Sequence, residues 1–144
     1  MQKGVAMAAP FVVLVVVLLL KLPITLRSRT LTGEAIQVAL YELRTYTLYV
    51  GKMAEAAKLY TEIGYPALDK GGHAKRLVGY FVSDVGTINQ LVHLWKFEDD
   101  ADRRQHWKGV FADAEFIKFA MQFRPLVMSQ EVKLLLPSAW GPHP

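Results

Sequence analysis

The segment YELRTY, residues 41–46, places a glutamate and an arginine two positions apart in a stretch with the composition of a β-strand. Because side chains alternate across a strand, Glu42 and Arg44 point to one face, while Tyr41 and Leu43 point to the other. An arginine in such a pair can hold the carboxylate or oxyanion of a ligand. The chemistry therefore depends on whether this face meets water or an enclosed polar interior.

A second strand-like run, residues 89–97, adds an imidazole and a large aromatic side chain. His93 has the residue type of a general base near neutral pH, and Trp95 lies on the same face of that strand. The candidate catalytic residues are His93, Glu42 and Arg44. The candidate ligand-binding residues are Tyr46, Trp95 and Glu131. A structural interpretation stays open beside this one, with His93 as a hydrogen-bonded structural histidine and Glu42 and Arg44 as a buried ion pair.

The elements that would position these side chains follow a regular order. Residues 39–48 alternate as a strand, residues 53–63 have helical spacing, and residues 77–97 form two strand-like runs around a turn. Gly64 and Pro66 are expected to end or kink the first helix. Asp99 and Asp113 are expected to cap two further helices, and residues 126–136 close the domain as a strand. The sequence predicts an α+β, ferredoxin-like βαββαβ fold, an antiparallel sheet with helices on one face.

Strand parity predicts which face the helices leave uncovered. Val92 and Leu94 suit the helix-covered side, whereas the parity with Glu42, Arg44, Tyr46, His93 and Trp95 mixes charge with aromatic rings. Glu131 is assigned to this mixed face as well. A solvated face seldom displays several large aromatic side chains, and a dry core seldom holds unpaired charges. We therefore expect the mixed face to pack against the sheet of a second copy, around a partly polar interior.

Four segments in this order and spacing resemble the NIPSNAP family: YELRTYTLYVGKMAEAAKLY, LVGYF, NQLVHLWKFED with the following ADRR, and RPLVMSQEVKLLLP. The resemblance covers about residues 38–137. It implies a dimeric α+β barrel, in which two chains set their sheets face to face. It also implies partner binding rather than an established catalytic activity, with mitochondrial links in animal members.

The first 37 residues differ from the rest. Residues 4–20 carry no charge, which is the short end of the length that spans a bilayer. This apolar segment, residues 1–37, is either a signal anchor or dispensable upstream sequence, and membrane contact would run through residues 4–26. The remaining regions are a NIPSNAP-like domain, residues 38–137, and a C-terminal tail, residues 138–144. We expect a cytoplasmic protein or one anchored through this segment; a mitochondrial location follows only by analogy with the family.

Charge and motifs exclude several classes of function. Four of the 17 basic and one of the 13 acidic residues lie in residues 1–38, so the body is nearly neutral, and we expect no nucleic-acid partner. The chain has no cysteine, and its four histidines show no ligand spacing, so we expect no metal site. No P-loop, GxGxxG or GxSxG motif occurs, and we expect no cofactor.

These patterns favour a homodimeric binding or structural module, which could hold a small apolar or carboxylate ligand in the barrel. The alternative is a small cofactor-independent, monooxygenase-like enzyme that uses His93 with Glu42 and Arg44. Related barrel families suggest this alternative by fold analogy alone.

Overall fold

A computed structural model describes residues 38–144 of the chain. The apolar segment of residues 1–37 and the predicted membrane contact through residues 4–26 lie outside the described residues. Within residues 38–144, no helix is both long enough and apolar enough to cross a lipid bilayer.

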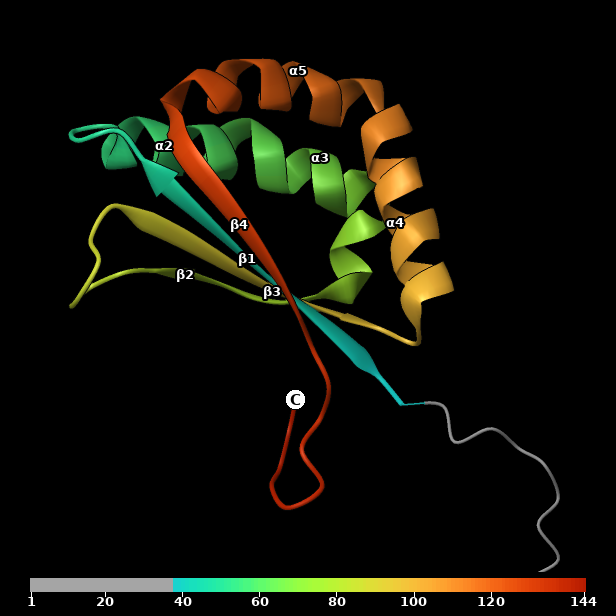
Figure 1. The fold of residues 1–144 in the computed structure, drawn as a ribbon. Helices are drawn as coiled ribbons and strands as arrows, with labels where there is room; N and C mark the ends of the chain where they lie inside the picture. The colour runs from blue at the N-terminus through green and yellow to red at the C-terminus, as the bar shows by residue number, and fades with distance from the viewer. Residues whose placement is uncertain (1–37) are drawn as a thin grey trace, which may run out of the picture. The chain divides into compact units, whose positions relative to one another are not determined.

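Four antiparallel strands form one sheet in the order β2-β3-β1-β4 (Figure 1). The strands are β1 (Leu40–Leu48), β2 (Leu77–Val82), β3 (Gln90–Phe97) and β4 (Val127–Leu135). The first strand of the sequence is thus central, and it pairs with β3 on one side and with β4 on the other. Its backbone is therefore paired with a neighbouring strand on each edge.

The helices all lie on one face of this sheet (Figure 1). The first helical segment comprises α2 (Met53–Leu59), a π-helical turn η2 (Tyr60–Gly64), α3 (Tyr65–Lys70) and a short 3-10 turn η3 (His73–Arg76). The second comprises α4 (Asp100–Ala112), α5 (Ala114–Phe123) and the 3-10 turn η4 (Arg124–Leu126). This arrangement confirms the predicted α+β, ferredoxin-like βαββαβ fold.

Both predicted aspartate caps are confirmed. The Asp99 carboxylate accepts a hydrogen bond from the backbone N–H of Asp102 at 2.8 Å, at the start of α4. The Asp113 carboxylate accepts one from the N–H of Glu115 at 2.9 Å, at the start of α5. Each cap satisfies a backbone donor that the first helical turn leaves without a partner.

The first helix does not end at Gly64, and the helical path continues to Lys70. At the junction the N–H of Tyr65 bonds to the carbonyl of Tyr60, five residues earlier, which makes a π turn just before Pro66. Gly64 also lies against α5, because a Cβ there would come within 2.7 Å of the Phe119 ring. Gly64 therefore permits close packing of two helices rather than a helix end.

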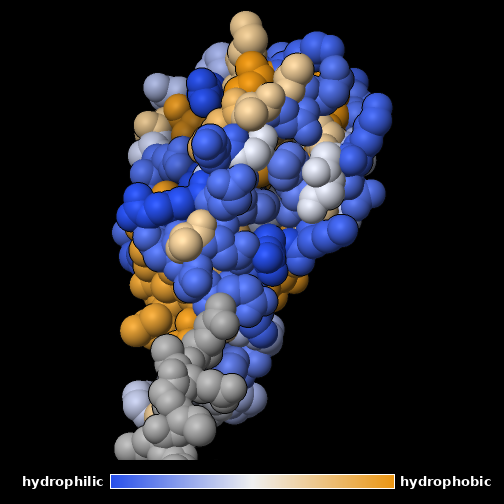
Figure 2. Space-filling model, turned by 90° about the vertical axis from the view of Figure 1, so that its right-hand side faces the viewer, coloured by the Kyte–Doolittle hydropathy of each residue, from blue (hydrophilic) through white to orange (hydrophobic). Residues whose placement is uncertain are grey.

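Two clusters of buried side chains lie between the helices and the sheet. One joins Leu48 and Leu91 to Phe119 and Phe123 of α5. The other is built around four large side chains, Trp95, Phe97, Trp107 and Leu68. Figure 2 views the molecule from the side on which α4 lies in Figure 1 and shows a mostly hydrophilic surface there. The apolar side of this layer is thus turned inward.

Candidate functional site

Glu42 is the centre of a buried polar network between β1 and α4. Its side chain is fully buried, and its Oε2 accepts hydrogen bonds from Arg103 Nη1 at 3.0 Å and from Trp107 Nε1 at 3.1 Å. Its other oxygen, Oε1, accepts from Arg44 Nε. Arg103 and Trp107 are four residues apart and so share one face of α4. A carboxylate with three donors is stable in this interior, because its charge is paired and both oxygens are bound.

Arg44 extends the network towards a cavity. Its guanidinium carbon lies 3.6 Å from the centroid of the Trp107 ring, and Nη1 donates a hydrogen bond to the Tyr46 hydroxyl at 3.4 Å. The side chain is only 12% exposed. Stacking on an indole and an ion pair with Glu42 together hold the guanidinium in one orientation.

The cavity beside Arg44 has a volume of about 360 Å³ and lies between the sheet and α5, with part of α4 as a wall. Seven aromatic side chains line it: Tyr46, Tyr60, Trp107, Phe111, Phe116, Phe119 and Phe123. Its polar lining includes Arg44, Tyr46, Arg124, Ser129 and Gln130. An apolar hollow with a few polar groups at one side is the usual composition of a small-molecule site.

His93 lies opposite Arg44 in the β1–β3 register and is surrounded by tyrosines. Its ring centroid lies 4.9 Å from that of Tyr46, 5.2 Å from that of Tyr60 and 4.3 Å from that of Tyr80. Burial, and secondly the Arg44 guanidinium, lower the pKa of His93 to about 3. The imidazole is therefore neutral at pH 7, and it is a weak general base.

Tyr60 separates two cavities. It lines the larger cavity beside Arg44 and also a smaller one, of about 190 Å³, that His93 and Tyr80 line. Burial raises the pKa of the Tyr60 and Tyr80 hydroxyls, so both hydroxyls remain protonated at neutral pH. Tyr60 opens the π turn η2, which directs its ring against Phe119 and Phe123. Such turns are frequent at functional sites.

The sequence grouped most of the candidate residues correctly but placed them on the wrong side of the sheet. Glu42 pairs with Trp95 and Arg44 with His93, so these four share one face with Tyr46. That face lies beneath the helices, and Trp95 belongs to the core with Trp107. The expectation that it meets a second sheet is wrong, because α4 provides the donors that the carboxylate needs.

Glu131 is on the uncovered face, as predicted, and is therefore separated from the other candidates. It pairs in register with Thr45, and its carboxylate lies 3.3 Å from Lys133 Nζ on an exposed surface. The uncovered face also carries Leu43, Val92 and Leu94. The assignment of Val92 and Leu94 to the helix side was wrong, because both faces of this sheet hold apolar side chains.

Sequence reasoning missed four residues of the site: Arg103, Trp107, Tyr60 and Tyr80. The first two carry a signal in their four-residue spacing on a helix that follows the strand with His93, although this spacing does not say which carboxylate they meet. Tyr60 and Tyr80 have no such signal, because a tyrosine at helical or strand spacing is most often an ordinary core residue.

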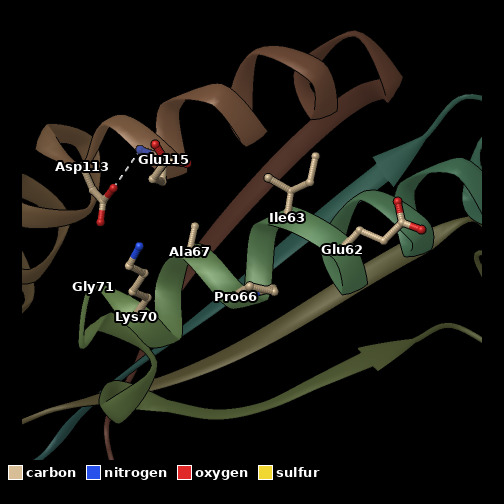
Figure 3. A pocket seen from close by; sticks show the side chains of 8 residues that line it. All are labelled: Glu62, Ile63, Pro66, Ala67, Lys70, Gly71, Asp113 and Glu115. Carbon is tan, nitrogen blue, oxygen red and sulfur yellow. Dashed lines mark hydrogen bonds between the residues drawn. The ribbon is translucent and has the colours of Figure 1, made fainter.

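A further hollow of about 370 Å³ lies outside the helical layer, between the η2–α3 helix and the start of α5 (Figure 3). Its lining is mainly small or charged, and Lys70 points towards the side of Asp113 (Figure 3). This groove lacks the aromatic walls of the cavity beside Arg44. Among residues 38–144 there is no group of three or more His, Cys, Asp or Glu side chains that could hold a metal ion.

The element order and sheet topology define a ferredoxin-like α+β protein with an aromatic, arginine-containing cavity between its layers. The chain belongs to the NIPSNAP family, whose sequence profile matches residues 41–142. It is 27% identical over 99 residues to Protein NipSnap homolog 2 of Danio rerio, an alignment that covers 68% of this chain and 33% of the relative. The chain thus spans about a third of that curated relative's length.

Solved structures agree with this assignment. A NIPSNAP family protein of unknown function from Agrobacterium tumefaciens is similar at a TM-score of 0.68 and 31% identity, over 75% of this chain and 96% of that one. An uncharacterized NIPSNAP domain protein from Burkholderia xenovorans has a TM-score of 0.66 and 32% identity, over 72% and 99%. A dimeric ferredoxin-like protein from an uncultured marine organism shares the fold at a TM-score of 0.54 and 11% identity, over 74% and 94%.

Proposed function

We propose that this chain is a homodimeric binding module that holds a small ligand in the cavity between its sheet and α5. The observation that carries the proposal is the combination, in one cavity of about 360 Å³, of seven aromatic side chains and a fixed arginine. Ligand pockets usually have volumes of about 300–1,000 Å³, so the ligand is a compact molecule. In this proposal the ligand lies beneath the helices rather than between two sheets.

The second part of the proposal, the homodimer, is supported by the uncovered sheet face. Leu43, Val92 and Leu94 lie together there, since Leu43 pairs with Leu94 and Val92 pairs with Thr45. Phe81 pairs with Val92 and is 55% exposed. A second copy of the same face would remove this apolar surface from water. The structural neighbour described as dimeric and ferredoxin-like is consistent with such an assembly.

The enzymatic alternative rests on the pairing of Arg44 with His93 on one buried face. A neutral imidazole beside a guanidinium could accept a proton while the guanidinium stabilises an oxyanion. Two facts make this alternative the weaker one. His93 lines the smaller cavity rather than the one with Arg44, and its lowered pKa makes it a poor base at neutral pH.

The binding proposal is tested by native mass spectrometry of the full chain, followed by denaturation to release bound small molecules. Ala120 lines the cavity, so Ala120→Leu reduces its volume, whereas Ala114→Leu is a matched change on an exposed position of the same helix. We expect a released small molecule from the wild type and from Ala114→Leu, and much less from Ala120→Leu. Equal occupancy in all three proteins, with circular dichroism unchanged, would overturn the assignment of this cavity.

A further inference from the structure

Resting on the proposed function, we infer that the ligand is an aromatic or cyclic apolar monoacid, whose carboxylate is bound by Arg44 and whose ring lies against the aromatic walls. Three independent features of the cavity lead to this class of molecule. They are the charge balance around Arg44, the orientation of its guanidinium and the composition of the lining.

The excess of positive charge lies in the cavity lining and not in the network behind it. Glu42 is shared by Arg44 and Arg103, and Asp100 is shared by Arg103 and Arg104. Arg104 is 73% exposed and its charge is met by water, so Arg44 and Arg103 are balanced by Glu42 and Asp100. The cavity lining itself contains Arg44 and Arg124 and no acidic side chain. Arg44 shares its one carboxylate with Arg103, so an anionic ligand would give it a partner that the lining does not provide.

The guanidinium of Arg44 is oriented so that it can receive an anion. Its plane lies over Trp107 and its Nε faces Glu42, so both the position and the direction of the group are fixed. A guanidinium has five N–H donors, and the described contacts engage Nε and Nη1. The terminal nitrogens therefore retain donor capacity, and Arg44 lines the cavity. A fork of this kind matches the two oxygens of a carboxylate.

The rest of the lining selects an apolar ring. Phe116, Phe119 and Phe123 lie along one side of α5, and Tyr60 closes the inner end against them. Aromatic walls favour a flat or cyclic apolar body over a flexible polar chain. A phosphate dianion is disfavoured, because Arg124 is exposed and Arg44 already pairs with Glu42.

The test compares matched neutral and anionic probes on the full-length wild-type chain. We would measure 1-naphthoate against 1-naphthamide, and cyclohexanecarboxylate against its amide, by isothermal titration calorimetry with tryptophan fluorescence as a second readout. We expect each acid to bind at least about tenfold more tightly than its amide, and salt to weaken the acid alone. Ala120→Leu should weaken both members of each pair, and Ala114→Leu neither.

The arginine assignment is tested by Arg44→Gln, with Arg44→Lys retaining the charge without the fork. The preference for the acid should be lost in Arg44→Gln and reduced in Arg44→Lys, whereas Lys118→Gln on the exposed side of α5 should leave it unchanged. Because the acid and amide comparison uses the wild type, it remains decisive if Arg44→Gln does not fold. Equal affinity for acid and amide would overturn the inference but keep the binding cavity. Failure of every probe, neutral or charged, would overturn both.

Discussion

The guanidinium carbon of Arg44, on the central strand, lies 3.6 Å from the centroid of the Trp107 ring, on α4. The same indole donates its Nε1 hydrogen to Glu42, which in turn accepts from Arg44. Strand, helix and charge pair are therefore joined in one closed set of contacts. This set stabilises the α4–sheet interface and also fixes the group that faces the cavity.

Removal of the Glu42 charge is expected to be severely destabilising. In Glu42→Gln two guanidinium groups lose their shared carboxylate inside the protein, and breaking a buried ion pair in this way costs about 3–5 kcal/mol. Urea unfolding followed by circular dichroism measures the loss. Glu131→Gln is the matched control, because that carboxylate is exposed on the other face of the sheet, and it should change stability by less than about 0.5 kcal/mol. Similar effects of the two changes would contradict the network.

The close approach of Gly64 to Phe119 makes a second prediction. A Cβ at position 64 would lie 2.7 Å from Phe119 Cε2, so Gly64→Ala should destabilise the domain by about 1–3 kcal/mol through overpacking. Phe119→Leu should partly rescue it, giving a double variant more stable than the sum of the two single changes predicts. Gly141→Ala, which meets only an ordinary contact at 3.6 Å, is the control. If the stability changes of Gly64→Ala and Phe119→Leu are strictly additive in thermal or urea unfolding, a clash between position 64 and the Phe119 ring is ruled out as the cause.

Assembly through the uncovered face is tested with Leu94→Glu. If two copies bury this face, the change places like charges opposite one another and should weaken association on the order of a hundredfold. Sedimentation velocity at micromolar concentration should then show a dimer for the wild type and a monomer for the variant. Val50→Glu, at a position that is 89% exposed, should remain dimeric. A monomeric wild type would refute the dimer outright.

Burial of His93 predicts a loss of stability in mild acid. The lowered pKa of about 3 means that the folded state stays unprotonated there, while the unfolded chain takes up a proton below its ordinary pKa of about 6.5. The loss of unfolding free energy caused by His93 is thus absent above pH 6.5. It grows by about 1.4 kcal/mol per pH unit as the pH falls from 6.5 towards 3.

The measurement is urea unfolding at pH 7.5 and pH 5.0 for the wild type and for His93→Gln. The wild type should lose about 2 kcal/mol more than the variant between these values. His143→Gln, in the C-terminal tail, should lose as much as the wild type. An identical acid loss in His93→Gln and the wild type would show that His93 is protonated as readily in the folded state as in the unfolded one.

The amino-acid sequence by itself determined the order of the elements, both aspartate caps and the grouping of Glu42, Arg44, Tyr46, His93 and Trp95 on one face. These features follow from local rules, because alternation and capping depend on neighbours within a few residues. The continuation of the first helix through Gly64 could not be predicted from local sequence rules. It depends on Phe119, which lies far away in the sequence and packs against that glycine.

Only the tertiary structure decided which face of the sheet the helices cover. Parity assigns residues to two sets but does not say which set is inside, and here both sets contain apolar side chains. The choice depends on Arg103 and Trp107, which reach Glu42 from α4 and make a buried carboxylate stable. Contacts between residues so far apart in the chain leave no periodic pattern in the sequence from which they could be predicted. For this reason the cavity beside Arg44 lies beneath the helices, where the strand pattern alone did not place it.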